Sequence, residues 1–224
     1  MPTNGSLSNV SAVIFDYGEV LCLPPTVEDL EASARILGIP LASFRVLWSR
    51  HRDLYDRGDL SEETYWCKVA EDAGISMDDR QLEQLGKNDV LMWSRTNPRM
   101  LAWLGDLSAA GMKTAVLSNM HASMAQHARQ NFPWLDLVTC TTLSAEVRLI
   151  KPDPAIYEHC LRGLEVAAAK CLFIDDREVN VAAARNLGIH GIQFRSMTQL
   201  TSELQAAGFP TLPRDLEEGI SKSV

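Results

Sequence analysis

Short, continuous apolar segments, each followed at once by polar or acidic residues, constrain the fold of this chain most. The three clearest are SAVIF (11–15), TAVL (114–117) and CLFI (171–174). Apolar runs that do not alternate with polar residues are typical of strands covered on both faces of a parallel sheet. GIQF (191–194) is a fourth such segment, and LVTC (137–140) is a weaker fifth candidate.

Helix signals lie between these segments. Two helices are expected to start where Asn or Asp precedes Pro, at 97–98 and 153–154, and a third where 196–199 has capping-box spacing. Gly111 and Gly208 stand where two of these helices should end. Because strands and helices alternate, we expect a doubly wound, Rossmann-like parallel sheet of the α/β class.

One region breaks this alternation. Residues 25–95 contain no convincing strand and four helical stretches: VEDLEASARIL, LASFRVLWSRHRDLY, EETYWCKVAEDA and DRQLEQLGKNDVLMW. Their apolar residues recur at helical spacing, which predicts an inserted all-helical domain. The α/β core would then comprise 1–24 and 96–224, with an irregular tail from Phe209 onward.

Composition narrows the classes of partner and the compartment. The chain has 224 residues, and 29 acidic against 21 basic side chains give it a formal charge of −8, which argues against general nucleic-acid binding. Five cysteines without a CxxC pair predict reduced thiols. We find neither a membrane-spanning run nor a secretory signal at 1–9, so we expect a cytoplasmic protein with no membrane partner.

Chemistry-bearing residues follow the predicted strands. They are Asp16, Ser118, Asn119, Asp175 and Asp176, together with Lys151 at the head of the KPDP helix. In an open parallel sheet, ligands bind outside the carboxyl ends of the strands, so these side chains should converge. Aspartate oxygens without Cys or His favour Mg²⁺ over Zn²⁺. An acidic pair with a lysine and Mg²⁺ is a suitable receptor for a phosphoryl group.

Four motifs in this order resemble those of the haloacid dehalogenase (HAD) superfamily. They are FDYGEVL, LSN, KPDPAIY, and FIDD followed by NVAAARNLG, and the resemblance covers about residues 10–194. The helical insert resembles the superfamily's cap domain. The DxGxV pattern with such a cap is similar to sugar-phosphate phosphatases and to the phosphatase domain of soluble epoxide hydrolase.

The resemblance implies a nucleophile and a metal site. Asp16 matches the aspartate that attacks phosphorus, forms an aspartyl-phosphate and binds Mg²⁺ through its other oxygen. The backbone carbonyl of Gly18 matches the second protein ligand of the metal. Asp176 matches the main ligand of the fourth motif, with Asp175 assisting directly or through water.

The resemblance also implies residues that bind the phosphoryl group. Ser118 matches the hydroxyl that donates to this group, with Asn119 behind it, and Lys151 matches the lysine that neutralises nucleophile and phosphoryl oxygens. Asn180 stands where related phosphatases have an amide near the leaving group or the cap. Among the histidines, His121 follows the second motif closely enough to reach substrate.

The sequence departs from the family pattern at one position. Most phosphatases of the superfamily carry a second aspartate two residues after the nucleophile, as acid and base; here that residue is Gly18, followed by Glu19. Three explanations stay open: Glu19 or a cap residue substitutes, the substrate has a good leaving group, or the protein is a slow or inactive relative. Because neighbouring residues leaving a strand point apart, we expect Glu19 to face away from the site.

We therefore expect a Mg²⁺-dependent phosphatase acting on a small phosphorylated metabolite, such as a sugar phosphate. Two alternatives remain. The haloacid dehalogenases also lack the second aspartate, but their site holds no metal and no paired carboxylates such as Asp175 and Asp176. A catalytically weak protein that binds a phosphorylated ligand is the other. The chain could be a monomer or a homodimer.

Overall fold

The sheet consists of five parallel strands in the order β3-β2-β1-β4-β5. A computed structural model describes residues 6–214 of the chain. The strands are β1 (Ala12–Phe15), β2 (Lys113–Ser118), β3 (Cys140–Leu143), β4 (Cys171–Asp175) and β5 (His190–Gln193). In the central strand, Phe15 pairs with Val116 on one side and Ile174 on the other. The predicted doubly wound α/β class is confirmed.

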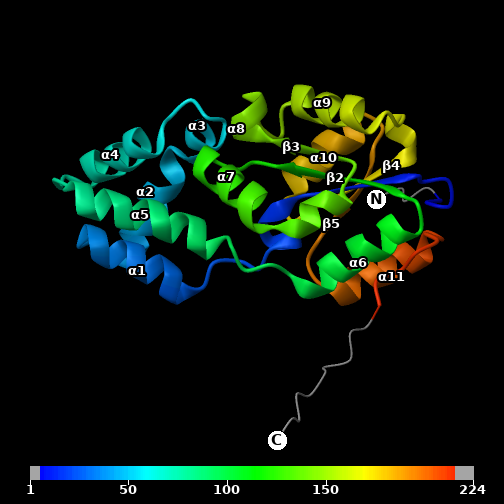
Figure 1. Cartoon of the computed structure of the whole chain (residues 1–224), viewed down its shortest axis with the longest axis horizontal. Coiled ribbons are helices and arrows are strands. Elements are labelled where there is room, and N and C mark those ends of the chain that lie inside the picture. Colours follow the sequence, from blue (N-terminus) through cyan, green and yellow to red (C-terminus); the bar gives the residue numbers. More distant parts are fainter. Residues whose placement is uncertain (1–5, 215–224) are drawn as a thin grey trace, which may run out of the picture.

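Helices cover both faces of the sheet (Figure 1). One face packs against α6 (Pro98–Ala109), α7 (Ala122–Asn131) and α11 (Met197–Ala206). The other packs against α9 (Pro154–Leu164) and α10 (Glu178–Asn186). Val13 and Phe15 point to the first layer, whereas Ala12 and Ile14 point to the second. Both sets are fully buried, which explains why the strand sequence is apolar throughout.

Three predicted helix starts are confirmed. Asn97 caps α6 by accepting from the backbone N–H of Met100, and Asp153 and Ser196 cap α9 and α11. The capping box at Ser196 is only half formed, because the amide oxygen of Gln199 accepts from the backbone of Arg195 instead.

The fifth predicted strand is wrong in position. Residues 133–137 form a short 3-10 helix, and Leu137 is 46% exposed. The strand lies three residues later, at Cys140–Leu143, where the β-branched Thr141 and Thr142 pair with Val116 and Leu117 of β2. The prediction relied on apolar content alone, and it therefore put this strand at 137–140, which is too early in the sequence. β3 is an edge strand, and edge strands need fewer apolar side chains.

Residues 27–92, between β1 and α6, form five helices with a hydrophobic cluster of their own. They are α1 (Val27–Leu37), α2 (Leu41–Arg50), α3 (Arg52–Asp56), α4 (Glu62–Ala73) and α5 (Asp79–Met92). Figure 1 shows them gathered at one end of the molecule, beside the sheet. The single helix expected over 41–55 is broken at His51, which turns the chain into α3.

Two linkers join this helical region to the sheet, and they pair with each other. Leu23 donates to the carbonyl of Arg95 at 2.7 Å, and Asn97 donates to the carbonyl of Leu21 at 2.8 Å. Cys22 and Thr96 form an antiparallel bridge between them. The predicted boundaries at 24/25 and 95/96 lie at this paired segment, and the division into two domains stays a prediction.

The remaining elements are short. They are η1 (Tyr17–Leu21), η2 (Pro133–Leu137), α8 (Ser144–Val147) and η3 (Ala168–Lys170). Residues 209–214 form neither helix nor strand, and the rest of the predicted irregular tail lies outside the described residues, as does the first half of segment 1–9. Within residues 6–214, no helix is both long and apolar enough to cross a bilayer.

Candidate active site

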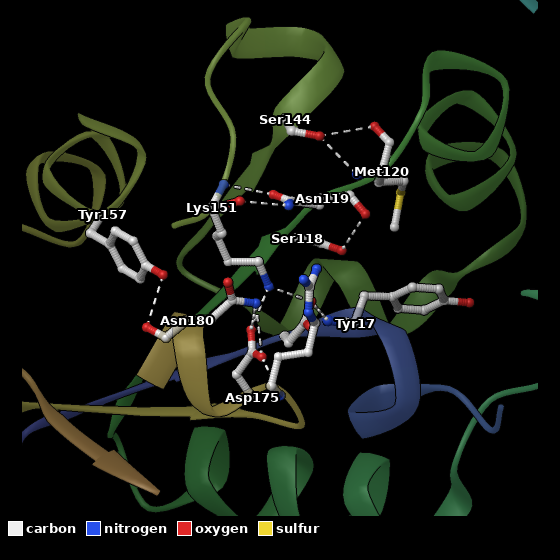
Figure 2. A network of polar contacts seen from close by, with 11 residues as sticks. Tyr17, Ser118, Asn119, Met120, Ser144, Lys151, Tyr157, Asp175 and Asn180 are labelled. Carbon is white, nitrogen blue, oxygen red and sulfur yellow. Dashed lines mark hydrogen bonds and ion pairs between the residues drawn. The ribbon is translucent and has the colours of Figure 1, made fainter. Parts of the chain in front are cut away.

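The order in which the chain adds strands reverses at the centre of the sheet, and the candidate site lies at that point. After β1 the chain builds β2 and β3 on one side and then returns to build β4 and β5 on the other. Ligands of such sheets bind at the carboxyl edge where the order reverses. Asp16 follows β1 there, Ser118 ends β2, and Asp175 ends β4. Figure 2 shows the side chains of Lys151, Ser118, Asn180 and Asp175 converging on this edge.

Lys151 is a buried cation between two carboxylates. Its Nζ lies 2.8 Å from Asp16 Oδ1 and 2.6 Å from Asp175 Oδ2, and the residue is only 3% exposed. Burial by itself lowers the pKa of Lys151, but the two carboxylates reverse this and raise it above its usual value. The ammonium therefore stays charged and holds the ends of β1 and β4 together.

Asn119 positions the lysine. Its amide nitrogen donates to the Lys151 carbonyl at 3.0 Å, and its amide oxygen accepts from the Lys151 backbone N–H at 2.8 Å. Figure 2 shows this pair of bonds. Both polar atoms of the Asn119 side-chain amide thus bond to the backbone of the KPDP loop. This contact makes Asn119 a positioning residue, and its contact with phosphate stays a prediction.

Ser118 and Asn180 complete the buried polar floor. Ser118 is 1% exposed, and within residues 6–214 its hydroxyl hydrogen-bonds only to the Asn119 carbonyl, at 3.4 Å. The amide nitrogen of Asn180 donates to both oxygens of Asp175, at 3.0 and 3.1 Å. Burial raises the pKa of Asp175. Contacts with Lys151, the Arg177 backbone N–H and Asn180 outweigh burial, so the pKa of Asp175 is lowered overall. Asn180 therefore supports an ionised Asp175, a role that the sequence did not suggest.

Three carboxylates of the site lie close enough to hold one metal ion. Asp16, Asp175 and Asp176 each offer one oxygen, and these oxygens all lie within 4.8 Å of one another. Burial raises the pKa of Asp16 to about 8 in spite of Lys151, and Asp175 adds to the rise. Burial, Asp175 and Glu19 raise the pKa of Asp176 to about 6. One ammonium leaves negative charge uncompensated, so the oxygen-only donor set fits a hard divalent cation such as Mg²⁺.

Glu19 does not face away from the site as expected. It lines the same cavity as Asp16 and contributes to the raised pKa of Asp176. The reason is local: Glu19 has φ 55°, a left-handed conformation, so the chain turns sharply after β1 instead of continuing in extended alternation. Gly18 has ordinary angles, and a Cβ added there would meet only Trp93 Cζ3, at 3.9 Å.

A cavity of about 380 Å³ extends from this edge toward the helical region. Its far wall is formed by Trp48, Ser49, Arg52, Asp53 and Asp56 of the helical region and by Trp93 after α5, and Met120, His121 and Met124 line the cavity from the segment that follows β2. Arg52 is held by Asp56 and Asp89 at 2.9 Å each, and it lies within 6 Å of the ring centres of three aromatic residues. Sequence analysis missed this cluster, because its members come from separate helices that no local motif connects.

His121, expected near the substrate, lines the cavity but presents little polar surface to it. Its ring stacks on Tyr55 with centroids 4.5 Å apart, and Nε2 lies 3.3 Å from Asp89. Both ring nitrogens are buried without a well-aligned hydrogen bond. Burial lowers the pKa of His121 to about 3, so the ring is neutral at physiological pH.

Comparison with known proteins decides the family. Residues 10–188 match the family model described as haloacid dehalogenase-like hydrolase. The chain belongs to this family of hydrolases. The predicted resemblance is thereby confirmed, while its finer subgroup stays a prediction.

Relatives of similar length include one fungal and one bacterial phosphatase. The chain is 26% identical to a sesquiterpene phosphatase of Aspergillus oryzae over 87% of its own length and 94% of the relative's. It is also 26% identical to a phosphatase of Mycobacterium tuberculosis, over 81% and 85% of the two lengths.

Solved structures share the fold. An HAD family enzyme of Bacteroides thetaiotaomicron, solved with magnesium and inorganic phosphate, superposes with a TM-score of 0.69 at 21% identity, over 83% of this chain and 94% of that one. An L-2-haloacid dehalogenase of Xanthobacter autotrophicus with chloropropionic acid covalently bound gives 0.62 at 21% identity, over 91% and 85%.

The carboxylate cluster generates a prediction about magnesium binding. Saturating Mg²⁺, at about 100 times its Kd, should stabilise the folded chain by about 2.7 kcal/mol and raise Tm by roughly 5–10 °C. Asp176→Asn should lose most of this shift, because it replaces one of the three carboxylates with a neutral amide, which is a weaker ligand for Mg²⁺. Asp53→Asn, which changes an exposed carboxylate of the same cavity, should keep it. Equal shifts in both variants would contradict this metal site.

Proposed function

We propose that the protein is a Mg²⁺-dependent phosphatase that hydrolyses a small phosphate monoester through an aspartyl-phosphate on Asp16. The observation that carries this proposal is the placement of Asp16 beside both a buried ammonium and two further carboxylates. A lone nucleophilic carboxylate would need only the lysine. Two more aspartates at the same point make electrostatic sense when a cation joins them. The phosphatase names of two relatives support the same reading.

The two oxygens of Asp16 have different surroundings. Lys151 Nζ and the Tyr17 backbone N–H both donate to Oδ1, at 2.8 and 2.6 Å. Among the described residues, no hydrogen bond to Oδ2 is found. Asp16 is therefore held in a fixed orientation by one oxygen, while the other has no hydrogen-bond partner among the described residues, which suits a nucleophile that lines the cavity.

The reaction follows from these positions. An Asp16 oxygen attacks phosphorus, the phosphorus–oxygen ester bond breaks, and the leaving alkoxide takes up a proton from solvent water. Lys151 and the Ser118 hydroxyl stabilise charge on the phosphoryl oxygens. A second water then attacks phosphorus of the acyl-phosphate and loses a proton to solvent, which releases phosphate and regenerates the Asp16 carboxylate. Mg²⁺, held by Asp16, Asp175, Asp176 and the Gly18 carbonyl, would neutralise phosphoryl charge and orient the group for in-line attack.

A dehalogenase remains the second candidate, because the fold is shared with an enzyme of that class. Attack by Asp16 on carbon would release halide and need no metal. The pair of Asp175 and Asp176 argues against it, since nothing in that reaction uses the extra negative charge. A weakly active protein that binds a phosphorylated ligand would share the site but turn over negligibly.

The proposal extends to the helical region and the location of the protein. Residues 25–95 would act as a cap that closes the cavity and selects the substrate, supported by the contribution of Trp48 and Arg52 to its far wall. Sugar phosphates were one expected substrate class, and no residue of the wall singles them out. A cytoplasmic location is supported by five cysteines that are all free.

The experiment that tests the function is a hydrolysis assay over phosphate esters, acyl phosphates and 2-haloacids. We expect phosphate release that needs Mg²⁺ and stops with excess chelator, and Asp16→Asn should abolish it, since an amide is a poor nucleophile. Full activity in chelator, or halide release without metal, would favour the dehalogenase. Saturable ligand binding without turnover would favour the binding protein.

A second prediction concerns the missing acid–base group. A Cβ added at Gly18 would make only ordinary van der Waals contact, with Trp93 Cζ3 at 3.9 Å, so Gly18→Asp should place a carboxylate near the leaving oxygen and accelerate turnover, up to the ~10²–10⁴-fold typical of general acid–base catalysis. Single-turnover kinetics should locate the gain in aspartyl-phosphate hydrolysis. The matched variant is Glu19→Gln. A nearly inactive Glu19→Gln together with no gain from Gly18→Asp would mean that Glu19 already supplies this group.

A further inference from the structure

One part of the cavity wall, formed by tryptophan and methionine side chains, presents carbon rather than hydrogen-bonding groups. Trp48 and Trp93 stack with ring centroids 6.4 Å apart and planes 17° from parallel. The indole nitrogen of Trp48 lies toward Asp89 at 3.4 Å, and that of Trp93 is buried without a partner. The parts of both rings that reach the cavity are therefore their carbon edges. Met120 and Met124 add two thioether side chains to the same cavity.

This carbon wall reaches the reacting end. The nearest atom to a Cβ added at Gly18 is Trp93 Cζ3, at 3.9 Å, so the aromatic edge faces the residue two positions after the nucleophile. Tyr17 fixes Trp93 in place by donating its hydroxyl hydrogen to the Trp93 carbonyl. An alcohol leaving from phosphorus would thus meet an aromatic edge close to the site of bond cleavage.

The charged groups of the far wall repel a second anion. The single cation, Arg52, is held by Asp56 and Asp89, and Asp53 adds an exposed carboxylate. These four groups carry one positive and three negative charges. Arg177 also lines the cavity, but it follows Asp176 at the sheet edge, on the phosphate side. The far wall therefore offers no uncompensated cation to a second phosphate or a carboxylate.

We infer that the substrate is the phosphate monoester of an apolar, uncharged alcohol, with its hydrocarbon part against Trp48, Trp93 and Met124 and no second anionic group. This inference rests on the proposed phosphatase function and narrows its substrate class. A polyol would leave its hydroxyl groups against carbon without hydrogen bonds, which costs binding energy. A hydrocarbon gains from leaving water at the same surface.

A series of alkyl phosphates tests this inference. Ethyl, butyl and hexyl phosphate have leaving groups of nearly equal basicity and differ in apolar area. With Mg²⁺ present, kcat/KM should rise along the series, by up to about fourfold for each methylene that becomes buried. Replacing the terminal methyl of hexyl phosphate with a carboxylate should lower kcat/KM, and glucose 6-phosphate should be poorer than hexyl phosphate. A flat series, or preference for the carboxylate or the sugar, would overturn the inference.

Variants assign the effect to the wall. Trp93→Gln should reduce the ratio of kcat/KM between hexyl and ethyl phosphate, whereas Leu91→Gln, which changes a 60% exposed side chain near it in sequence, should leave that ratio unchanged. Asp53→Asn should narrow the gap between hexyl phosphate and its carboxylate analogue. An unchanged ratio in Trp93→Gln would exclude this wall as the selector, and the wild-type series decides the substrate class if that variant does not fold.

The inference and the proposed function fail in different ways. If ethyl and acetyl phosphate are hydrolysed but the alkyl series is flat, the substrate class is wrong and the phosphatase stands. If no phosphate compound is hydrolysed, the function is wrong. Calorimetric binding of ethyl and hexyl phosphate to Asp16→Asn then still tests the wall: tighter binding of hexyl phosphate supports it, and equal binding overturns it.

Discussion

The ammonium of Lys151, buried between Asp16 and Asp175, is the interaction on which the site depends. It joins the residue after β1 to the last residue of β4, and the strand order reverses between these two neighbouring strands. Without it, buried carboxylates would face each other across the sheet edge, a costly arrangement. Asn119 fixes the lysine backbone and Asn180 fixes Asp175, so the polar floor is rigid before any ligand arrives.

One lysine does not balance the charge of three aspartates. The raised pKa values of Asp16 and Asp176 express this excess of negative charge, and a divalent cation would offset it and leave Lys151 to face the incoming phosphoryl group. The far wall has no such unmet demand for a cation. Its cation, Arg52, is already paired with carboxylates, and Trp48 and Trp93 present carbon to the cavity. The cavity thus joins the polar sheet edge to a wall that carries an aromatic carbon surface, and we infer that the phosphate ester of a hydrocarbon matches both parts.

Sequence reasoning succeeded where local pattern and topology suffice. The apolar runs before Asp16, Ser118 and Asp175 predicted strands buried on both faces, and parallel strands must bring their carboxyl ends to one edge. The Pro-containing helix starts were equally local. The expectation failed where geometry depends on a single backbone angle or on packing. Glu19 turns into the cavity because of a left-handed φ.

The apolar wall was beyond sequence reasoning for a related reason. Trp48 and Trp93 come from α2 and from the end of α5, 45 positions apart, and each matches an ordinary core residue of an amphipathic helix. Arg52 and Asp89 meet only after α3 and α5 pack together. The predicted position of β3 was wrong because the threonines that form this edge strand carry a weaker apolar signal than the residues just before them.

Covalent capture of the reaction intermediate would show whether Asp16 is the nucleophile. Wild-type protein would be mixed with hexyl phosphate and Mg²⁺, quenched in acid during turnover, digested and analysed by mass spectrometry. We expect one phosphoryl group on the peptide that contains Asp16, on that side chain, and none in Asp16→Asn. Turnover with the adduct on another residue, or an alkyl ester on Asp16 in place of a phosphoryl group, would contradict this expectation.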